Sequence, residues 1–193
     1  MATKKSTAER LPARERLLAA AGELFYEEGF NAVGIDRVIE RAGVAKASLY
    51  DCFGSKEELI RSYLSERQQR REERIHTALA TYATPRERLL GMFDQLGKAA
   101  AEANFRGCAF VRANGEAKAG SSVRAVCDES RQWLRDLFVT LCCDVGATDP
   151  EVLAQQLVIL YDGATVSAQM DRDPQAAAAA RTVAAAMLDA AVR

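Results

Sequence analysis

The sequence predicts an all-α protein of about nine helices, and two observations carry that prediction. Apolar residues recur at intervals of three and four along almost the whole chain of 193 residues, which is the period of a helix with one buried face. Short polar stretches with helix start and stop signals separate these segments, and none of the segments alternates convincingly between apolar and polar residues as a half-buried strand would. We therefore expect helices almost throughout the chain.

The N-terminal part predicts three helices preceded by a polar, basic tail over residues 1–10. The first helix is expected to end at Gly29, after apolar residues at helical spacing: Leu17, Leu18, Ala21, Leu24 and Phe25. Two short helices follow, over about 35–42 and 46–52, and Gly43 lies between them, where the turn needs a residue that tolerates positive φ. This arrangement is typical of a helix-turn-helix.

The fourth helix is predicted to be long and to begin after Ser55, because Ser55 and Glu58 have the spacing of a capping box. Its apolar stripe gives way to a mixed-charge run over residues 67–74. We interpret this run as a solvated helix face with ion pairs four residues apart. A helix that connects two lobes would show the same pattern.

Five more helices are predicted in the C-terminal part. Thr84-Pro85 with Glu87 forms a second start signal, and a short helix is expected within 108–119. A long helix should follow with one apolar face, formed by Val123, Val126, Ser130, Trp133, Leu137, Leu141 and Val145. The last two helices, over 151–170 and 175–192, are rich in small and apolar residues around much of their circumference. We expect a homodimer through about residues 149–192, as a four-helix bundle across two subunits, although a core within one chain would also use part of these surfaces.

Composition excludes several classes of protein. With 49% hydrophobic and 27% charged residues, the chain is an ordinary globular protein, and it has neither an apolar run of roughly 20 residues for a membrane span nor a secretory signal pattern, so we expect it in the cytoplasm. The five cysteines lack CxxC spacing, which argues against a disulfide framework. His76 is the single histidine and no glycine-rich nucleotide-binding motif occurs, so we expect no metal site, no cofactor and no enzyme. An enzyme that uses carboxylates for acid–base chemistry is the second hypothesis.

Four side chains in the predicted helix-turn-helix region have no core role at their spacing. Lys46, Ser48 and Tyr50 fall on the N-terminal half of the third helix, and Lys56 begins the fourth. Free backbone N–H groups and the helix dipole favour phosphate at such positions. The net charge is only −1, so contact with DNA would have to come from locally placed charge such as this.

The sequence from Ala42 to Phe53, continued by Gly54-Ser55-Lys56-Glu57-Glu58-Leu59, resembles the signature of TetR-type transcriptional regulators. The segment from Leu17 to Phe25 and the later Glu28-Gly29-Phe30 are similar to the first helix of that family. The resemblance implies a helix-turn-helix DNA-binding domain over 11–72 and a ligand-binding and dimerisation domain over 73–193. It also implies a repressor that leaves a near-palindromic double-stranded operator when a small effector binds.

Carried over residue by residue, the resemblance implies a set of DNA-facing positions: Arg37, Ala45, Lys46, Ala47, Ser48, Tyr50, Asp51 and Lys56. The sequence departs from the family pattern at Val33-Gly34, where the family usually has a threonine pair that caps the second helix. Gly34 caps a helix nearly as well as threonine but lacks a hydroxyl that could reach phosphate. Ala45, Ala47 and Cys52 replace the usual serine, glycine and histidine, so the number of phosphate contacts is expected to differ from the family's.

In the C-terminal part, Arg106-Gly107-Cys108 followed by Asn114 and Glu116 resembles one branch of the family, in which this segment begins the helix that borders the ligand cavity. The candidate ligand-lining residues are Phe105, Cys108, Phe110, Trp133, Tyr161 and Met170, and core packing is the alternative for each. Because few charges are expected there, we predict an apolar or aromatic ligand. A solid core instead would favour the third hypothesis, a constitutive DNA-binding protein without a sensor role. The sequence leaves open the effector, the operator and the choice between repression and activation.

Overall fold

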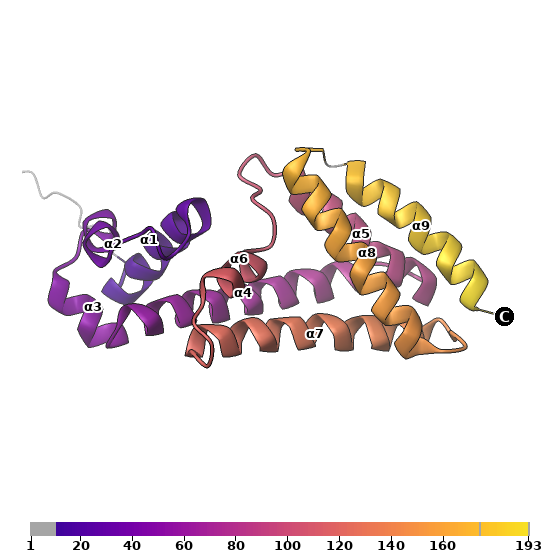
Figure 1. Cartoon of the computed structure of the whole chain (residues 1–193), viewed down its shortest axis with the longest axis horizontal. Helices are drawn as coiled ribbons and strands as arrows, with labels where there is room; N and C mark the ends of the chain where they lie inside the picture. Colours follow the sequence, from indigo (N-terminus) through magenta and orange to yellow (C-terminus); the bar gives the residue numbers. More distant parts are fainter. Residues whose placement is uncertain (1–10, 174, 193) are drawn as a thin grey trace, which may run out of the picture.

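The computed structural model describes residues 11–173 and 175–192, and this part of the chain folds into nine helices without a strand (Figure 1). The helices are α1 (Ala13–Glu28), α2 (Ile35–Ala42), α3 (Lys46–Phe53), α4 (Lys56–Leu79), α5 (Pro85–Ala100), α6 (Ala109–Glu116), α7 (Ser122–Asp144), α8 (Pro150–Met170) and α9 (Gln175–Ala191). The predicted all-α class and helix number are confirmed. The predicted basic tail, residues 1–10, lies outside the described residues.

The first three helices pack into a small head at one end of the elongated molecule (Figure 1). Leu17 of α1, Val38 of α2 and Leu49 of α3 are fully buried and belong to one core. Gly43, between α2 and α3, has φ 62° in the left-handed region, where a residue without a Cβ is favoured. The helix-turn-helix therefore has the geometry expected from its glycine.

Helix α4 runs from the head along most of the length of the molecule, with α7 packed beside it (Figure 1). It begins as predicted, because the Ser55 hydroxyl accepts a hydrogen bond from the Glu58 N–H. The Glu58 carboxylate turns to the Arg61 guanidinium at 2.7 Å, so only one half of the capping box forms. The predicted domain boundary at residue 72 lies inside this 24-residue helix, which crosses it without a break.

The larger body contains α5, α7, α8, α9 and the C-terminal part of α4 around a second core. Phe93, Phe138 and Tyr161 pack edge to face at its centre, with ring centroids 5.7–6.3 Å apart. At the start of α5, both halves of the capping box between Thr84 and Glu87 are present, as predicted.

The buried face of α7 departs from the predicted stripe in its second half. Leu134 and Phe138 are buried there, whereas Trp133 and Leu137 are only partly covered. After Ser130, the predicted stripe takes a step of three residues to Trp133, whereas the buried face takes a step of four to Leu134, and the two coincide again at Leu141. Steps of three and four both occur in a helix with 3.6 residues per turn, so the spacing alone does not decide which residue of such a pair is buried.

The head also shares its core with the body. Phe110 of α6 and Val126 of α7 pack into the same cluster as the head residues. Polar contacts join the same two parts, since the Asn31 N–H donates to the Glu116 carboxylate at 2.8 Å. A change in the position of α6 would therefore alter the packing of the head.

None of the helices in the described part of the chain is long and apolar enough to cross a membrane.

Candidate nucleic-acid interface and body cavity

Helix α3 presents polar and small side chains to solvent on the side away from the head core. Lys46, Ala47 and Asp51 are exposed, and Tyr50 is 45% exposed despite its aromatic ring. Ala45, the N-cap residue of α3, supplies no side-chain hydrogen bond. The backbone N–H groups in the first turn of α3 therefore have no side-chain cap. Free N–H groups of this kind bind phosphate at the start of a helix.

The predicted basic residues of the head have ion-pair partners or partial cover within the chain. Lys46 Nζ lies 3.1 Å from Asp36 Oδ1, and Arg37 makes a two-pronged contact with Glu28 at 2.6 and 2.8 Å. The hydrogen bond from Lys46 to Asp36 raises the pKa of the lysine. All four side chains are exposed, and exposed ion pairs add little to the stability of a protein. Such pairs can be exchanged for contacts with phosphate at little cost.

Lys56, the first residue of α4, is partly covered. Burial lowers the pKa of its ammonium group, while the nearby Glu116 carboxylate opposes that effect. Six of the eight predicted DNA-facing residues thus lie on α3 or its N-cap, Arg37 lies on α2, and Lys56 lies on α4. Arg37 is held toward α1 by Glu28 in this structure.

Tyr26, near the C-terminal end of α1, joins the head to the body. Its hydroxyl accepts a hydrogen bond from the Arg106 N–H at 2.8 Å and donates one to the Gly107 carbonyl at 3.3 Å. Its backbone carbonyl accepts from the Arg112 guanidinium at 2.6 Å, and the Arg67 guanidinium lies 4.2 Å from its ring centroid. One residue of the head therefore contacts α4, α6 and the segment before α6.

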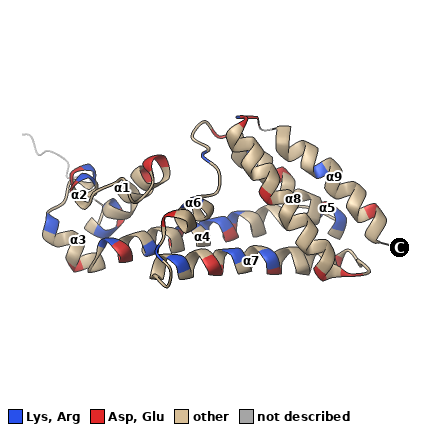
Figure 2. Cartoon of the chain, viewed as in Figure 1, with Lys and Arg blue, Asp and Glu red and all other residues tan. Residues whose placement is uncertain are grey.

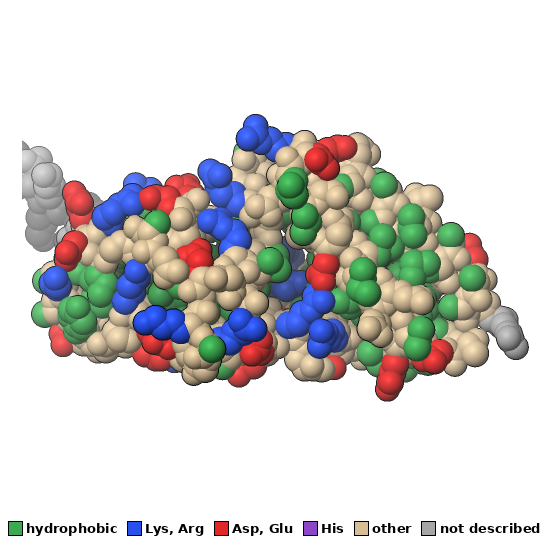
Figure 3. All heavy atoms as spheres, in the orientation of Figure 1, with side chains coloured by type: hydrophobic (Ala, Val, Ile, Leu, Met, Phe, Trp, Pro, Cys, Tyr) green, Lys and Arg blue, Asp and Glu red, His purple; other side chains and the backbone are tan. Residues whose placement is uncertain are grey.

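A cavity of about 980 Å³ lies beside Tyr26, between the head and the body. Its walls come from α1, α4, α5, the segment over residues 101–108, α6, α7 and α8. The molecular surface is hollowed there, and basic side chains lie in the hollow (Figure 3). The cavity is about as large as the pockets that bind drug-sized ligands.

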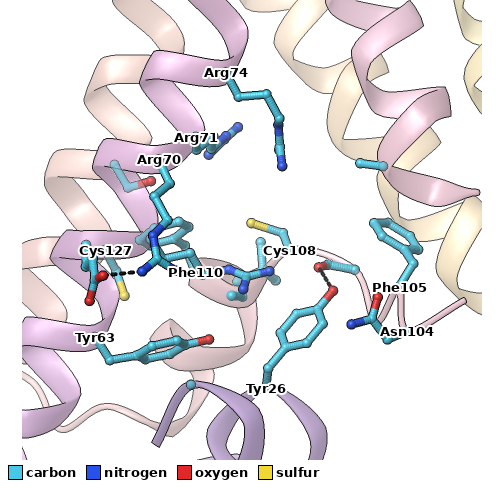
Figure 4. Close-up of a pocket in the computed structure, with 18 of the residues that line it drawn as sticks. Tyr26, Tyr63, Arg70, Arg71, Arg74, Asn104, Phe105, Cys108, Phe110 and Cys127 are labelled. Atoms are coloured by element: carbon cyan, nitrogen blue, oxygen red, sulfur yellow. Dashed lines mark hydrogen bonds and ion pairs between the residues drawn. The ribbon is translucent and has the colours of Figure 1, made fainter. Parts of the chain in front are cut away.

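Four of the six predicted ligand-lining residues border this cavity: Phe105, Cys108, Phe110 and Tyr161. Figure 4 shows the first three of them. Met170 does not, because it lies at the end of α8 with 76% of its surface exposed. Trp133 also lies outside the lining; its ring packs against His76 and under the Arg71 guanidinium. Both residues lie outside the lining because the rotation of α8 and of α7 about its own axis points their side chains away from the cavity.

The mixed-charge run of α4 corrects two expectations. Arg67, Arg70, Arg71 and Arg74 line the cavity, so this part of the run is not simply a solvated face. Figure 4 shows Arg70, Arg71 and Arg74 there. The expectation of a cavity with few charges is wrong for the same reason. The spacing of these arginines places them on one side of α4 together with Tyr63, a pattern that could have indicated a shared site.

The comparisons with known proteins agree with this architecture. The family model described as "Bacterial regulatory proteins, tetR family" matches residues 17–63. A solved structure of a candidate TetR transcriptional regulator from Streptomyces avermitilis is 32% identical, with 93% of this chain and 98% of that chain aligned and a TM-score of 0.81. This chain belongs to the TetR family.

TetR-family proteins are DNA-binding transcriptional regulators and not enzymes, so the predicted regulatory class is confirmed. The HTH-type transcriptional activator FasR of Mycolicibacterium smegmatis is 41% identical over 83 residues, which cover 42% of this chain and 38% of that relative's length. The HTH-type transcriptional repressor NemR of Escherichia coli K12 is 26% identical over 172 residues, which cover 82% of this chain and 85% of NemR. The relatives therefore include both an activator and a repressor.

Proposed function

We propose that this TetR-family chain is a homodimeric repressor that releases its operator when a small effector fills the body cavity. The observation that carries the proposal is the position of the cavity, whose walls include α1 of the DNA-binding head and the α4 helix that connects head and body. An effector in this place touches both parts of the molecule. The predicted division into a DNA-binding domain over 11–72 and an effector and dimerisation domain over 73–193 is retained within this proposal.

The dimer is supported by a stripe on the outer face of α8. The α8 residues predicted to pack on one face, such as Leu153, Leu157 and Ala164, are buried in the chain's own core. The opposite face carries residues spaced four and three apart, which is the spacing that packs against a partner helix: Val152, Gln156, Ile159, Gly163, Val166 and Met170. An added Cβ at Gly163 would meet nothing within 4 Å, so a partner helix could approach closely there.

Charge on α8 and α9 is sparse, and the charged side chains of α9 pair with residues of the same chain. Few charged residues lie along these helices (Figure 2), and their outer surface shows clustered hydrophobic side chains (Figure 3). On α9, Arg181 pairs with Asp94 and Asp189 pairs with Arg86, both at 2.9 Å. The ionic groups of α9 are thus bound within the chain, which leaves an apolar face suited to a second copy over about residues 149–192.

In such a dimer, a twofold axis would relate the two heads, and each α3 would enter a major groove. Successive grooves on one face of B-DNA lie roughly 34–36 Å apart, and a twofold dimer reads a near-palindromic sequence. Lys46 and Tyr50 on α3 and Lys56 at the start of α4 would contact phosphates, and Ser48 would face the groove. Repression is preferred to activation because the repressor NemR aligns over 82% of this chain, whereas the activator FasR aligns over 42% of it.

Effector response follows from the contacts of Tyr26. An effector that displaces the Arg67 guanidinium from the Tyr26 ring, or moves the segment before α6, alters the support of α1. If it binds more tightly to the dimer shape that does not fit the operator, occupancy lowers operator affinity, and operator DNA lowers effector affinity by the same factor.

Selection of duplexes from a random DNA pool tests the proposal. The full chain should enrich near-palindromic duplexes, and the Lys46→Ala variant should bind the enriched duplex more weakly at every salt concentration. Enrichment of no duplex, or enrichment of sequences without twofold symmetry, would overturn the proposed operator. The Lys98→Ala variant, which removes an exposed lysine of the body, serves as the control and should bind like the wild type.

A further inference from the structure

We infer that the body cavity is an anion-binding effector site that takes an organic acid with an apolar body. This inference rests on the proposed function, because the ligand is an effector only if its binding changes the affinity for the operator. It starts from Arg67, Arg71 and Arg74, which share one side of α4 and line the cavity. Figure 4 shows Arg71 and Arg74 at this wall. Arg67 and Arg71 are partly buried and Arg74 is exposed. A guanidinium binds carboxylate, sulfonate or phosphate oxygens through paired hydrogen bonds.

These three arginines form no ion pair with the described part of the chain. No carboxylate oxygen there lies within 4 Å of a guanidinium nitrogen of Arg67, Arg71 or Arg74. Arg67 and Arg71 lie instead over the rings of Tyr26 and Trp133, at 4.2 and 5.3 Å from the centroids.

Acidic residues also line the cavity, but most of them are engaged with other arginines. Glu66 pairs with Arg70, Asp162 with Arg131, Asp128 with Arg124, and Glu23 with Arg41. Three others, Glu15, Glu27 and Glu102, are exposed at the rim. The acidic side chains therefore leave Arg67, Arg71 and Arg74 available to a ligand.

A buried hydroxyl adds a second polar group to the site. Tyr63 is 91% buried, and its hydroxyl has no hydrogen-bond partner among the described residues. Its ring extends toward the cavity on the same side of α4 as the arginines (Figure 4). A buried polar group without a partner costs about 1–3 kcal/mol, and a ligand oxygen would supply the missing acceptor. Burial raises the pKa of this hydroxyl, which keeps it protonated as a donor.

The remaining lining determines the rest of the ligand. Leu18, Leu96, Phe105, Phe110 and Leu134 contribute apolar surface to the cavity. A small inorganic anion would satisfy the arginines but leave this apolar surface in contact with water. An amphipathic organic anion covers both parts, so the geometry favours an acid group against α4 and an aromatic or aliphatic body toward α6 and α7.

Two fluorescent probes that differ in charge test the inference without DNA. Anilinonaphthalenesulfonate carries a sulfonate on an apolar body, and N-phenylnaphthylamine is a neutral analogue. The variants Arg67→Gln and Arg71→Gln should each weaken binding of the sulfonate about tenfold or more, because each removes charge-assisted hydrogen bonds. Affinity for the neutral probe should change less than about twofold, and Arg71→Lys should recover part of the loss.

The Arg135→Gln variant is the matched control, since Arg135 is exposed on α7 outside the cavity. Equal sulfonate affinity in the wild type, Arg67→Gln and Arg71→Gln would overturn the inference. If a glutamine variant misfolds and binds neither probe, the salt dependence of the wild type tests the inference. About 0.5 M salt should lower its affinity for the sulfonate but not for the neutral probe. Operator binding by the same variants is measured separately, so a protein that binds the sulfonate through its arginines but binds no duplex would refute the proposed function alone.

Discussion

Replacing Ile159 tests whether the outer face of α8 forms the dimer. Ile159 is 64% exposed in the single chain and lies in the middle of the α8 stripe. In the proposed dimer its exposed surface becomes buried, whereas the fold of each chain does not depend on it. The Ile159→Ala variant should therefore weaken dimerisation and leave the stability of the monomer nearly unchanged.

The magnitude follows from the exposed fraction. Burying an isoleucine side chain completely contributes about 1.5–3 kcal/mol, and 64% of that surface is free in this chain, so each copy should contribute about 1–2 kcal/mol. The residue occurs twice in a twofold dimer. The loss of about 2–4 kcal/mol corresponds to a dimer dissociation constant raised roughly 30-fold to several-hundred-fold.

Sedimentation over a series of protein concentrations measures this constant. Val111→Ala is the control, because Val111 is 62% exposed but lies on α6, away from α8 and α9. An unchanged dissociation constant in Ile159→Ala, or an equal loss in Val111→Ala, would refute the placement of the interface. The urea midpoint of the monomer should be the same in both variants.

Three further predictions concern the head, its junction with the body and the core. Lys46→Ala should lower affinity for every duplex and reduce the slope of log affinity against log salt by about one for each bound chain; a slope unchanged from wild type in a filter-binding titration would contradict the phosphate contact. Tyr26→Phe removes the hydroxyl that contacts Arg106 and Gly107. It should lower the free energy of unfolding by about 1–2 kcal/mol and speed hydrogen exchange at the Arg106 amide. If exchange at this amide is no faster than in the control variant Tyr50→Phe, the contact does not hold the segment before α6. Burial raises the pKa of the Cys127 thiol to about 11, from 9.0, so the unfolded chain loses this proton first and the free energy of unfolding should fall as the pH rises from about 9 toward 11. Urea titrations at the two ends of that range should show a smaller fall in Cys127→Ala than in Cys143→Ser, which replaces an exposed thiol; equal falls would contradict the role of the buried thiol.

Local signals in the sequence were sufficient for the helices and for the helix-turn-helix. Gly29 and Gly43 end α1 and α2 where expected, and Thr84 with Glu87 starts α5. These features depend on residues within four positions of one another, so one sequence contains all the information that they need.

The cavity depended on contacts that no local pattern records. Tyr26 meets Arg106, 80 positions later in the chain, and the arginines of α4 resemble those of any solvated helix until the neighbouring helices are in place. Met170 is a candidate lining residue from the sequence, but its position at the end of α8 leaves it exposed. Residue type was therefore a weaker guide than helix phase and three-dimensional neighbours.

The stoichiometry and footprint of the protein on a selected duplex test the central claim most directly. Sedimentation of the complex should give two chains per duplex, and hydroxyl-radical footprinting should protect two half-sites about one helical turn apart, roughly 10 base pairs. The Ile159→Ala variant should reach the same footprint only at higher protein concentration. A single chain bound per duplex, or one protected segment without a symmetric mate, would contradict a dimeric regulator that reads DNA through paired α3 helices.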